Sequence, residues 1–328
     1  MTSQALTTTQ PAEIATPAAA ARRVKRYLDA RQSPNTRRAY GWHWAHFLAF
    51  CEPRRYNPLP ATPATVADYL TAQADQGAPV RSIQARLAAI GYHHAQAQAD
   101  NPTKTLAVVE TMKGIRRALG VAAKPKKALA LADLRRMMAA LPDDLRGKRD
   151  RALVLIGYAG AFRRSELAAL TRADVDLDER GAVIVIRHSK TDQESAGLVK
   201  NVPALDADPD ICPVRALRAW LDAAGITSGP LWRAIDRWGN IRAAALTGHE
   251  VARFVKTAAA LVGLDATTLA GHSLRAGFAT EAAMHGADAW QIMEQTGHRS
   301  VESLNRYIRS AGKGARRATF AAFGMAAK

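Results

Sequence analysis

The chain has 328 residues, which is long enough for two domains that each bury a hydrophobic core. Its 46 Lys and Arg residues outnumber the 29 Asp and Glu residues, and the formal net charge of +17 indicates a polyanionic partner. Its two cysteines, Cys51 and Cys212, lie far apart and exclude a disulfide framework and a cysteine-based zinc site. No apolar run reaches membrane-spanning length and no signal-peptide pattern opens the chain, so we expect a cytoplasmic protein without a membrane partner.

The positive charge is concentrated in the first part of the chain. Residues 1–127 contain 18 basic and 7 acidic side chains, a balance of +11. Residues 128–328 contain 28 basic and 22 acidic side chains, a balance of +6, and the two balances sum to +17. We therefore expect the first part to be the stronger electrostatic clamp on the polyanion.

A disordered tail and a helical domain are predicted at the start of the chain. Residues 1–20 are rich in Thr, Ala, Pro and Gln with almost no charge and no apolar period, which predicts the tail. Residues 21–120 predict a compact helical domain with helices at 36–50, 62–76, 79–96 and 101–119, the first of them after a turn at 33–36. On the first of these helices, one face is expected in the core rather than stacked on bases: Tyr40, Trp44, Phe47 and Leu48.

Basic side chains on this domain are candidate phosphate contacts. Arg37 and Arg38 lie near a helix start, where they either meet phosphate or form a solvated charged end. Arg81 and Arg86 lie on the third helix. Residues 121–127 have no apolar period, and we expect an exposed basic linker that lies along nucleic acid through Lys124, Lys126 and Lys127.

The second domain is predicted to begin with helices at 132–141 and 149–159. After the second of these, Gly160 ends the helix and Arg163 and Arg164 follow at the break. Two arginines between buried helices are costly to desolvate without a partner, and Arg163 is the better candidate to point inward. Glu166 is three residues on and could orient this guanidinium, although the two residues could also form a purely structural salt bridge.

Two β-branched runs at residues 181–187 and 197–203 predict the strands of a hairpin. The tip between them carries Lys190. A lysine at such a tip could swing onto a bound phosphate and give up a proton, and the alternative is an ordinary solvated loop lysine. Further helices are expected at 213–224 and at 247–262, where Thr247 and Glu250 have the spacing of a capping box.

The last sixty residues contain three closely spaced polar motifs. His272 and Arg275 are three apart on a predicted helix, so both side chains leave one face and can hold one anion together. His298 follows a glycine, and Tyr307 comes nine residues later. A phenol beside cations and a proton acceptor suggests a hydroxyl that attacks. Each residue alone is more often a core aromatic or a helix cap, but three such motifs in succession favour a site.

The ordered set Arg163, Lys190, His272 with Arg275, His298 and Tyr307 resembles the active-site motifs of the tyrosine recombinases, also called the phage integrase family. The resemblance covers about residues 128–312 as the catalytic domain, and the helical front domain is similar to the core-binding domain of the family. It implies a mostly α fold with a small β-hairpin or sheet, in which the two domains form a C-shaped clamp on DNA. Residues 313–328 would then form a C-terminal segment.

The resemblance also implies a mechanism. Tyr307 would attack a scissile phosphate, forming a 3′-phosphotyrosyl link that needs no ATP, cofactor or metal. Arg163 and Arg275 would hold the non-bridging oxygens. Lys190 would donate a proton to the leaving 5′-oxygen, His272 would assist proton removal from the phenol, and His298 would bond a non-bridging oxygen. Glu166 would order the site without touching the substrate.

Family members exchange strands between two duplexes, so the resemblance implies double-stranded DNA with inverted-repeat sites, a homotetramer on DNA, and association with the nucleoid. Accessory proteins are possible partners. We expect a C-terminal helix with Phe320 and Phe323 to dock on a neighbouring protomer. Two other functions stay open at this point: a type IB topoisomerase with the same chemistry, and a DNA-binding accessory protein without turnover.

Overall fold

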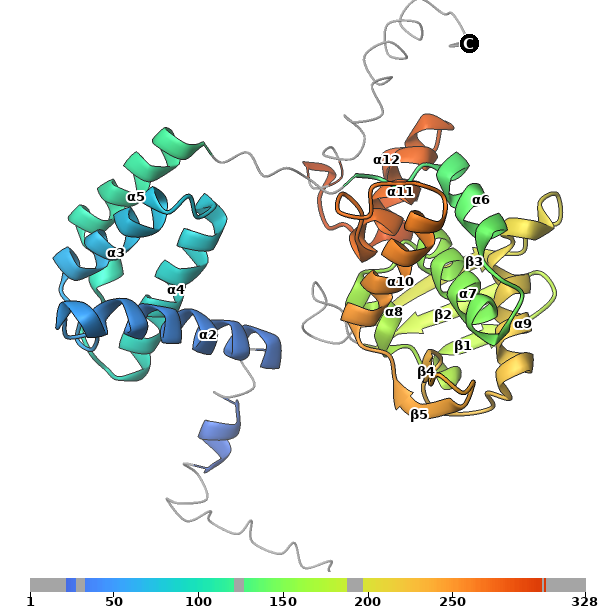
Figure 1. The fold of residues 1–328 in the computed structure, drawn as a ribbon, viewed down its shortest axis with the longest axis horizontal. Helices are drawn as coiled ribbons and strands as arrows, with labels where there is room; N and C mark the ends of the chain where they lie inside the picture. The colour runs from blue at the N-terminus through green and yellow to red at the C-terminus, as the bar shows by residue number, and fades with distance from the viewer. Residues whose placement is uncertain (1–21, 28–32, 121–126, 188–196, 303, 305–328) are drawn as a thin grey trace, which may run out of the picture. The chain divides into compact units, whose positions relative to one another are not determined.

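The computed structural model describes residues 22–27, 33–120, 127–187, 197–302 and 304. The chain divides into two compact units between Lys124 and Pro125 (Figure 1). This division falls within the predicted linker of residues 121–127, whose ends remain a prediction. The predicted tail at residues 1–20 and the C-terminal segment at residues 313–328 lie outside the described residues.

The described residues of the first unit form four long helices, after a short helical stretch at residues 22–27. These helices are α2 (Pro34–Cys51), α3 (Pro63–Asp75), α4 (Val80–Gln96) and α5 (Leu106–Leu119), with short 3-10 turns η1 (Glu52–Arg54) and η2 (Pro102–Lys104). Side-chain hydroxyl groups cap the N-termini of α2 and α3. Ser33 Oγ accepts from Thr36 N at 3.2 Å, and Thr62 Oγ1 accepts from Thr65 N at 3.1 Å. The four predicted helices therefore form close to their expected bounds.

The core of the first unit is formed mainly by side chains at helical spacing on α2, α3, α4 and α5. Phe47 is fully buried as predicted, but Leu48 is 39% exposed, so its assignment to the core was wrong. The reason is rotation around the helix axis. The inward stripe continues from Phe47 to Phe50 and Cys51, three and four residues on, while Leu48 lies about 100° away from it.

The second unit is also mainly helical. Its helices are α6 (Leu131–Ala140), α7 (Leu145–Ala159), α8 (Arg164–Ala169), α9 (Pro213–Ala224), α10 (Gly248–Leu261), α11 (Gly271–Met284) and α12 (Ala289–Thr296), with 3-10 turns η3 (Arg172–Asp174) and η4 (Pro209–Ile211). The predicted helix at 149–159 begins earlier, at Leu145, because Asp144 accepts from Gly147 N at 2.7 Å and caps an additional turn.

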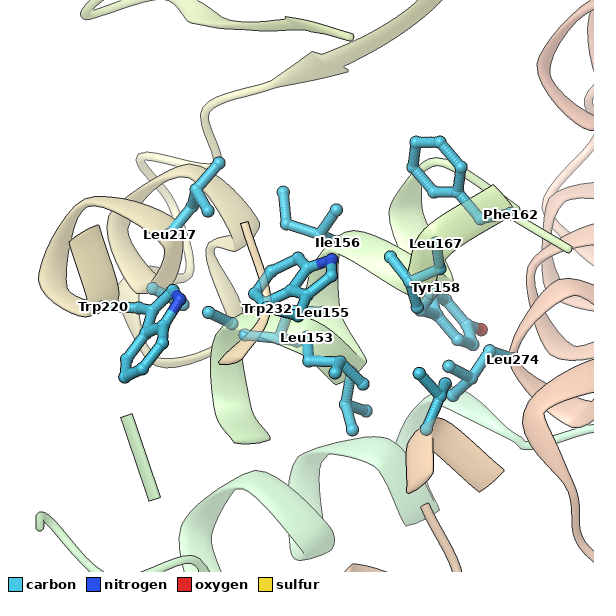
Figure 2. Close-up of a cluster of buried hydrophobic side chains, with 14 of the residues drawn as sticks. Leu153, Leu155, Ile156, Tyr158, Phe162, Leu167, Leu217, Trp220, Trp232 and Leu274 are labelled. Carbon is cyan, nitrogen blue, oxygen red and sulfur yellow. The ribbon is translucent and has the colours of Figure 1, made fainter. Parts of the chain in front are cut away.

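Helix α7 is the centre of this second core. It packs against α9 and α11. Figure 2 shows its Leu153, Leu155 and Ile156 among Trp220, Trp232 and Leu274, which come from other elements. Burial of large apolar side chains of this kind contributes roughly 1.5–3 kcal/mol each to folding. The residues after α7 are therefore attached to the centre of the buried core.

A three-stranded antiparallel sheet, in the order β1-β2-β3, lies beside the helices. Its strands are β1 (Val175–Leu177), β2 (Gly181–Ile186) and β3 (Leu198–Pro203), with Ile184 opposite Lys200. The two predicted strands form as a hairpin. The sequence missed β1 and the small hairpin of β4 (Arg233–Ile235) and β5 (Ile241–Ala245), because they are short and carry little β-branched pattern.

The predicted fold class, mostly α with a small β-hairpin or sheet, is confirmed. None of the helices in the described part of the chain is both long and apolar enough to span a membrane.

Candidate active site

The turn between α7 and α8 holds Arg275 in place. Ala161 lies in this turn with a φ of +48°, a left-handed conformation that is uncommon for a residue with a Cβ atom. Its carbonyl accepts a hydrogen bond from Arg275 Nη1 at 2.9 Å. Arg275 is only 1% exposed, so its guanidinium is fixed between the end of α7 and the start of α11.

Arg163 lies at the N-cap position of α8 and forms an ion pair with Glu166. Its Nη1 donates to Glu166 Oε1 at 2.6 Å, and its backbone N–H donates to Oε2 at 2.9 Å. The carboxylate is almost fully buried, while the neighbouring Arg164 is exposed. The inward arginine and the salt bridge, which the sequence offered as alternatives, therefore occur together.

His272 and Arg275 both come from the first turn of α11, as their spacing predicted. The helix begins at Gly271, and Ser273 Oγ accepts from Ala270 N at 3.1 Å to close its first turn. A Cβ atom at Gly271 would lie 3.0 Å from Cγ of Arg164, so a larger residue there would press on α8. His272 is exposed and Arg275 is buried, which places one at the surface of the site and the other at its base.

His298 follows the end of α12 at a left-handed glycine. Gly297 has a φ of +65°, and its N–H donates to Met293 O at 2.6 Å. Burial is the main cause that lowers the pKa of His298 to about 4, and four nearby basic side chains act in the same direction: Arg275, Arg163, His272 and Lys200. These four groups come from α11, the start of α8 and β3, so residues distant in sequence converge on His298.

Lys200 of β3 is a member of this cluster that the sequence analysis missed. Its side chain is fully buried, and Nζ donates to the backbone oxygen of Gln295 near the end of α12. Burial is the main cause that lowers the pKa of Lys200 to about 7; Arg275 and Arg163 act in the same direction, and the Glu166 carboxylate opposes them. The sequence pattern could have predicted this burial, because side chains alternate between the two faces of β3 and Lys200 lies on the same face as the buried Val202.

Gln295 ties α12 to the rest of the site. Its Nε2 donates to Ala159 O at 2.8 Å and to Asn201 O at 3.0 Å. Together with the bond from Lys200 Nζ, these contacts join the end of α12 to α7 and β3. The turn that carries His298 is therefore held against both the central helix and the sheet.

The structure brings five of the predicted residues together, and two others lie outside its described part. The five are Arg163, Glu166, His272, Arg275 and His298. Lys190 and Tyr307 fall in the segments that the structure does not describe. The described part of the chain contains no group of three or more His, Cys, Asp or Glu residues suited to a metal ion.

The predicted phosphate contacts differ in exposure. Arg37, Arg38 and Arg81 are exposed on the first unit, and Lys127 is exposed at the start of the second. Arg86 is half-buried instead, and its Nε has no hydrogen-bond partner among the described residues. Lys124 and Lys126 fall outside the described residues.

Arg86 lies close to two histidines of α2. Burial lowers the pKa of His43 and of His46, and the charge of Arg86 lowers both further. Arg86 is therefore part of a packed cluster between α2 and α4 rather than a freely extended side chain.

Two buried or half-buried guanidinium groups and a buried lysine form a fixed positive field at the base of this site. Guanidinium forks match the oxygens of phosphate, and groups held by backbone carbonyls and a carboxylate need little reorganisation when charge develops. The arrangement is suited to an anion whose charge is spread over several oxygens, such as a phosphodiester during nucleophilic substitution at phosphorus.

Comparisons with known proteins agree with this chemistry. The family model described as Phage integrase family matches residues 127–313. The chain is 38% identical over 291 residues to the integrase/recombinase xerD homolog of Selenomonas ruminantium, covering 87% of this chain and 84% of that protein. It is 25% identical over 193 residues to the recombinase cre of Escherichia phage P1, covering 57% and 53%.

Solved structures share the fold. XerH site-specific recombinase bound to palindromic difH substrate in a post-cleavage complex gives a TM-score of 0.59 at 19% identity, covering 79% of this chain and 72% of that one. A lambda integrase dimer bound to a COC′ core site gives 0.59 at 17% identity, covering 88% and 75%. The family match spans more than half of the chain. The chain therefore belongs to the phage integrase family and is a site-specific tyrosine recombinase, as the resemblance predicted.

Proposed function

We propose that this site cleaves and rejoins double-stranded DNA through a covalent link between Tyr307 and a 3′-phosphate. The supporting observation is the convergence of Arg275, Arg163 and His272 on the half-buried His298. Burial is the main cause that lowers the pKa of this histidine to about 4, and these three groups act in the same direction. Two guanidinium groups gathered at one site are matched to a negatively charged substrate.

In this mechanism the two arginines act where charge accumulates. Arg163 and Arg275 bond the non-bridging oxygens of the scissile phosphate and stabilise the pentavalent transition state. Lys190 protonates the leaving 5′-oxygen, and His272 assists removal of the proton from Tyr307. The phosphotyrosyl bond retains the energy of the phosphodiester, so rejoining needs no nucleotide cofactor. Glu166 holds Arg163 in place through their ion pair.

The first prediction concerns the nucleophile. A nicked suicide duplex releases the strand beyond the cut, so a covalent protein–DNA adduct should accumulate with the wild-type protein and be visible after denaturing electrophoresis. Tyr307→Phe should bind the same duplex and form no adduct, because the attacking oxygen is missing. Tyr27→Phe, at an exposed tyrosine of the first unit, is the matched control and should form adduct normally.

The target duplex for this assay comes from immunoprecipitating the adduct from cells and sequencing the trapped DNA ends. An adduct that persists in Tyr307→Phe would exclude this residue as the nucleophile. Relaxation of supercoiled DNA without any recombinant product would instead favour the topoisomerase function.

We also propose that the protein is associated with the nucleoid, and that four protomers assemble there on two duplexes with inverted-repeat sites, together with any accessory proteins. The C-terminal segment, Gly314 to Met325, carries Phe320 and Phe323, which would dock on a neighbouring protomer. Truncation after Ser310 should leave binding of one duplex intact and abolish the slower-migrating synaptic complex in a gel-shift assay. Unchanged synapsis would contradict this docking.

A further inference from the structure

Thr296, the last residue of α12, makes two short contacts through one hydroxyl group. Its side chain is fully buried. Its Oγ1 lies 2.6 Å from Ile292 O and 2.7 Å from His298 Nδ1, while Met293 O is farther away at 3.5 Å. The hydroxyl therefore bridges the backbone of α12 and the imidazole of the active site.

Counting hydrogen atoms decides which group donates. A carbonyl oxygen only accepts, so the 2.6 Å contact with Ile292 O requires the hydroxyl hydrogen of Thr296. A hydroxyl has one hydrogen, so the hydrogen between Oγ1 and His298 Nδ1 must come from the imidazole. The reverse arrangement would leave two oxygen atoms 2.6 Å apart with no hydrogen between them.

We propose that Thr296 is a positioning residue that fixes His298 in the Nδ1–H tautomer. While the ring is neutral, its Nε2 atom then carries a lone pair and accepts hydrogen bonds. His298 donates to a non-bridging phosphate oxygen through Nε2 only after it binds a proton from solvent. This last step rests on the proposed function, whereas the tautomer follows from the hydrogen-bond geometry.

The charges around His298 make proton binding depend on DNA. In the free protein Arg163 from α8, His272 and Arg275 from α11 and Lys200 from β3 disfavour an imidazolium. The acidic groups nearby are Glu166 beneath the site and Asp288 and Glu294, which line the same hollow on α12 as His298. A bound phosphate adds a negative charge among these cations and raises the affinity of Nε2 for a proton.

The tautomer is measured directly by NMR on the full-length protein with ¹⁵N-labelled histidine. The ¹⁵N chemical shift of an imidazole nitrogen that carries a hydrogen differs strongly from that of one that does not. The signals that disappear in the spectrum of His298→Gln are those of the His298 ring. We expect Nδ1–H in the wild type near neutral pH and in Thr296→Ser, which keeps the hydroxyl. Thr296→Val removes the acceptor and should shift His298 to Nε2–H, while signals of the other histidines report that the fold is kept.

An Nε2–H signal in the wild type would overturn the proposal without recourse to any variant, and so would an unchanged Nδ1–H signal in folded Thr296→Val. Should the valine variant fail to fold, Thr296→Ala removes the same hydroxyl with a smaller side chain.

The pH dependence of cleavage tests the functional step. Single-turnover adduct formation by the wild type should fall with rising pH as the bound His298 loses its proton. Thr296→Val should lose this dependence, because its neutral ring already donates through Nε2, and Thr296→Ser should keep it. If the wild type forms no adduct at any pH, the proposed function fails, while the NMR result still decides the tautomer. Identical pH profiles in wild type and Thr296→Val would refute the link between tautomer and cleavage.

Discussion

Lys200 has a fully buried amino group close to two arginines and one carboxylate. Burying a charge is costly, and removing it from water next to like charges is more so. The residue is retained in a position where it bonds the backbone of Gln295 and adds to the positive base of the site. Loss of the proton from Lys200 would remove the free-energy cost of burying its charge. The protonation of Lys200 therefore depends on the charge of any group bound in the site.

Replacing this lysine should change how stability depends on pH. The folded-state pKa of about 7 lies below the ordinary value of 10.5, so between these values the unfolded chain binds more protons than the folded chain. The free energy of unfolding should therefore rise with pH in this window, by up to about 1.4 kcal/mol per pH unit. Lys200→Met should flatten this rise in urea unfolding at pH 7–10, and Lys256→Met, at an exposed lysine, should not.

Parallel pH curves for the wild type and Lys200→Met would show that Lys200 titrates normally. The same experiment at lower pH gives a second check, because the methionine variant should be the more stable protein wherever the lysine is forced to stay charged.

At the scale of single elements, the turn between α7 and α8 decides where the arginines lie. Gly160 precedes the left-handed Ala161, and a Cβ atom on Gly160 would overlap the buried ring of Phe162. The turn can adopt its shape only without a side chain at this position. It presents the Ala161 carbonyl to Arg275 and places Arg163 at the N-cap of α8, so one turn positions both guanidinium groups.

Gly160→Ala should therefore damage both stability and cleavage. Overpacking of this kind typically costs about 1–3 kcal/mol, and the displaced ring would shift the carbonyl that holds Arg275. We expect a lower unfolding midpoint and a slower rate of adduct formation, with DNA binding less affected. Gly114→Ala is the control, because no heavy atom lies within 4 Å of its added Cβ in α5. Equal stability of the two variants would contradict this account of the turn.

Sequence pattern predicted the long elements and missed the short ones for physical reasons. Helices with caps and an apolar stripe, such as α3 and α10, were recognisable: α3 from its apolar spacing, and α10 from the capping-box spacing of Thr247 and Glu250. Strands of three residues have too few side chains to show an alternation, which is why β1 was not predicted. Lys200 was missed because a lysine in a strand is normally solvated, and its burial depends on the distant end of α12.

At the scale of the whole molecule, the charge of +17 is unevenly placed, with +11 in residues 1–127 and +6 in the remainder. The second unit has acidic residues with structural roles, including Glu166 and Asp174, which are both buried. Its balance is therefore closer to neutral although its active site is strongly positive. Net charge identified the class of partner, but it could not locate the site.

The salt dependence of DNA binding should show whether the lysines of the predicted basic linker contact DNA phosphates. Each neutralised phosphate contributes about 0.9 to the slope of log K against log salt concentration. Replacing Lys124, Lys126 and Lys127 together with Ala should reduce that slope by up to about 3, measured by fluorescence anisotropy at several salt concentrations. The backbone of Lys127 bonds Thr268 O at 3.0 Å, so its own replacement should leave the second unit folded. An unchanged slope would remove the linker from the DNA-binding surface.

The ion pair between Arg163 and Glu166 also affects how this protein is studied in cells. Because the same carboxylate caps α8 and partners the guanidinium, Arg163→Ala would take a countercharge from a buried group at the start of a helix. Such losses typically cost about 3–5 kcal/mol, enough for proteases to clear the chain. A null phenotype from that allele would confound lost chemistry with lost protein, so complementation studies need an immunoblot or an allele at another position.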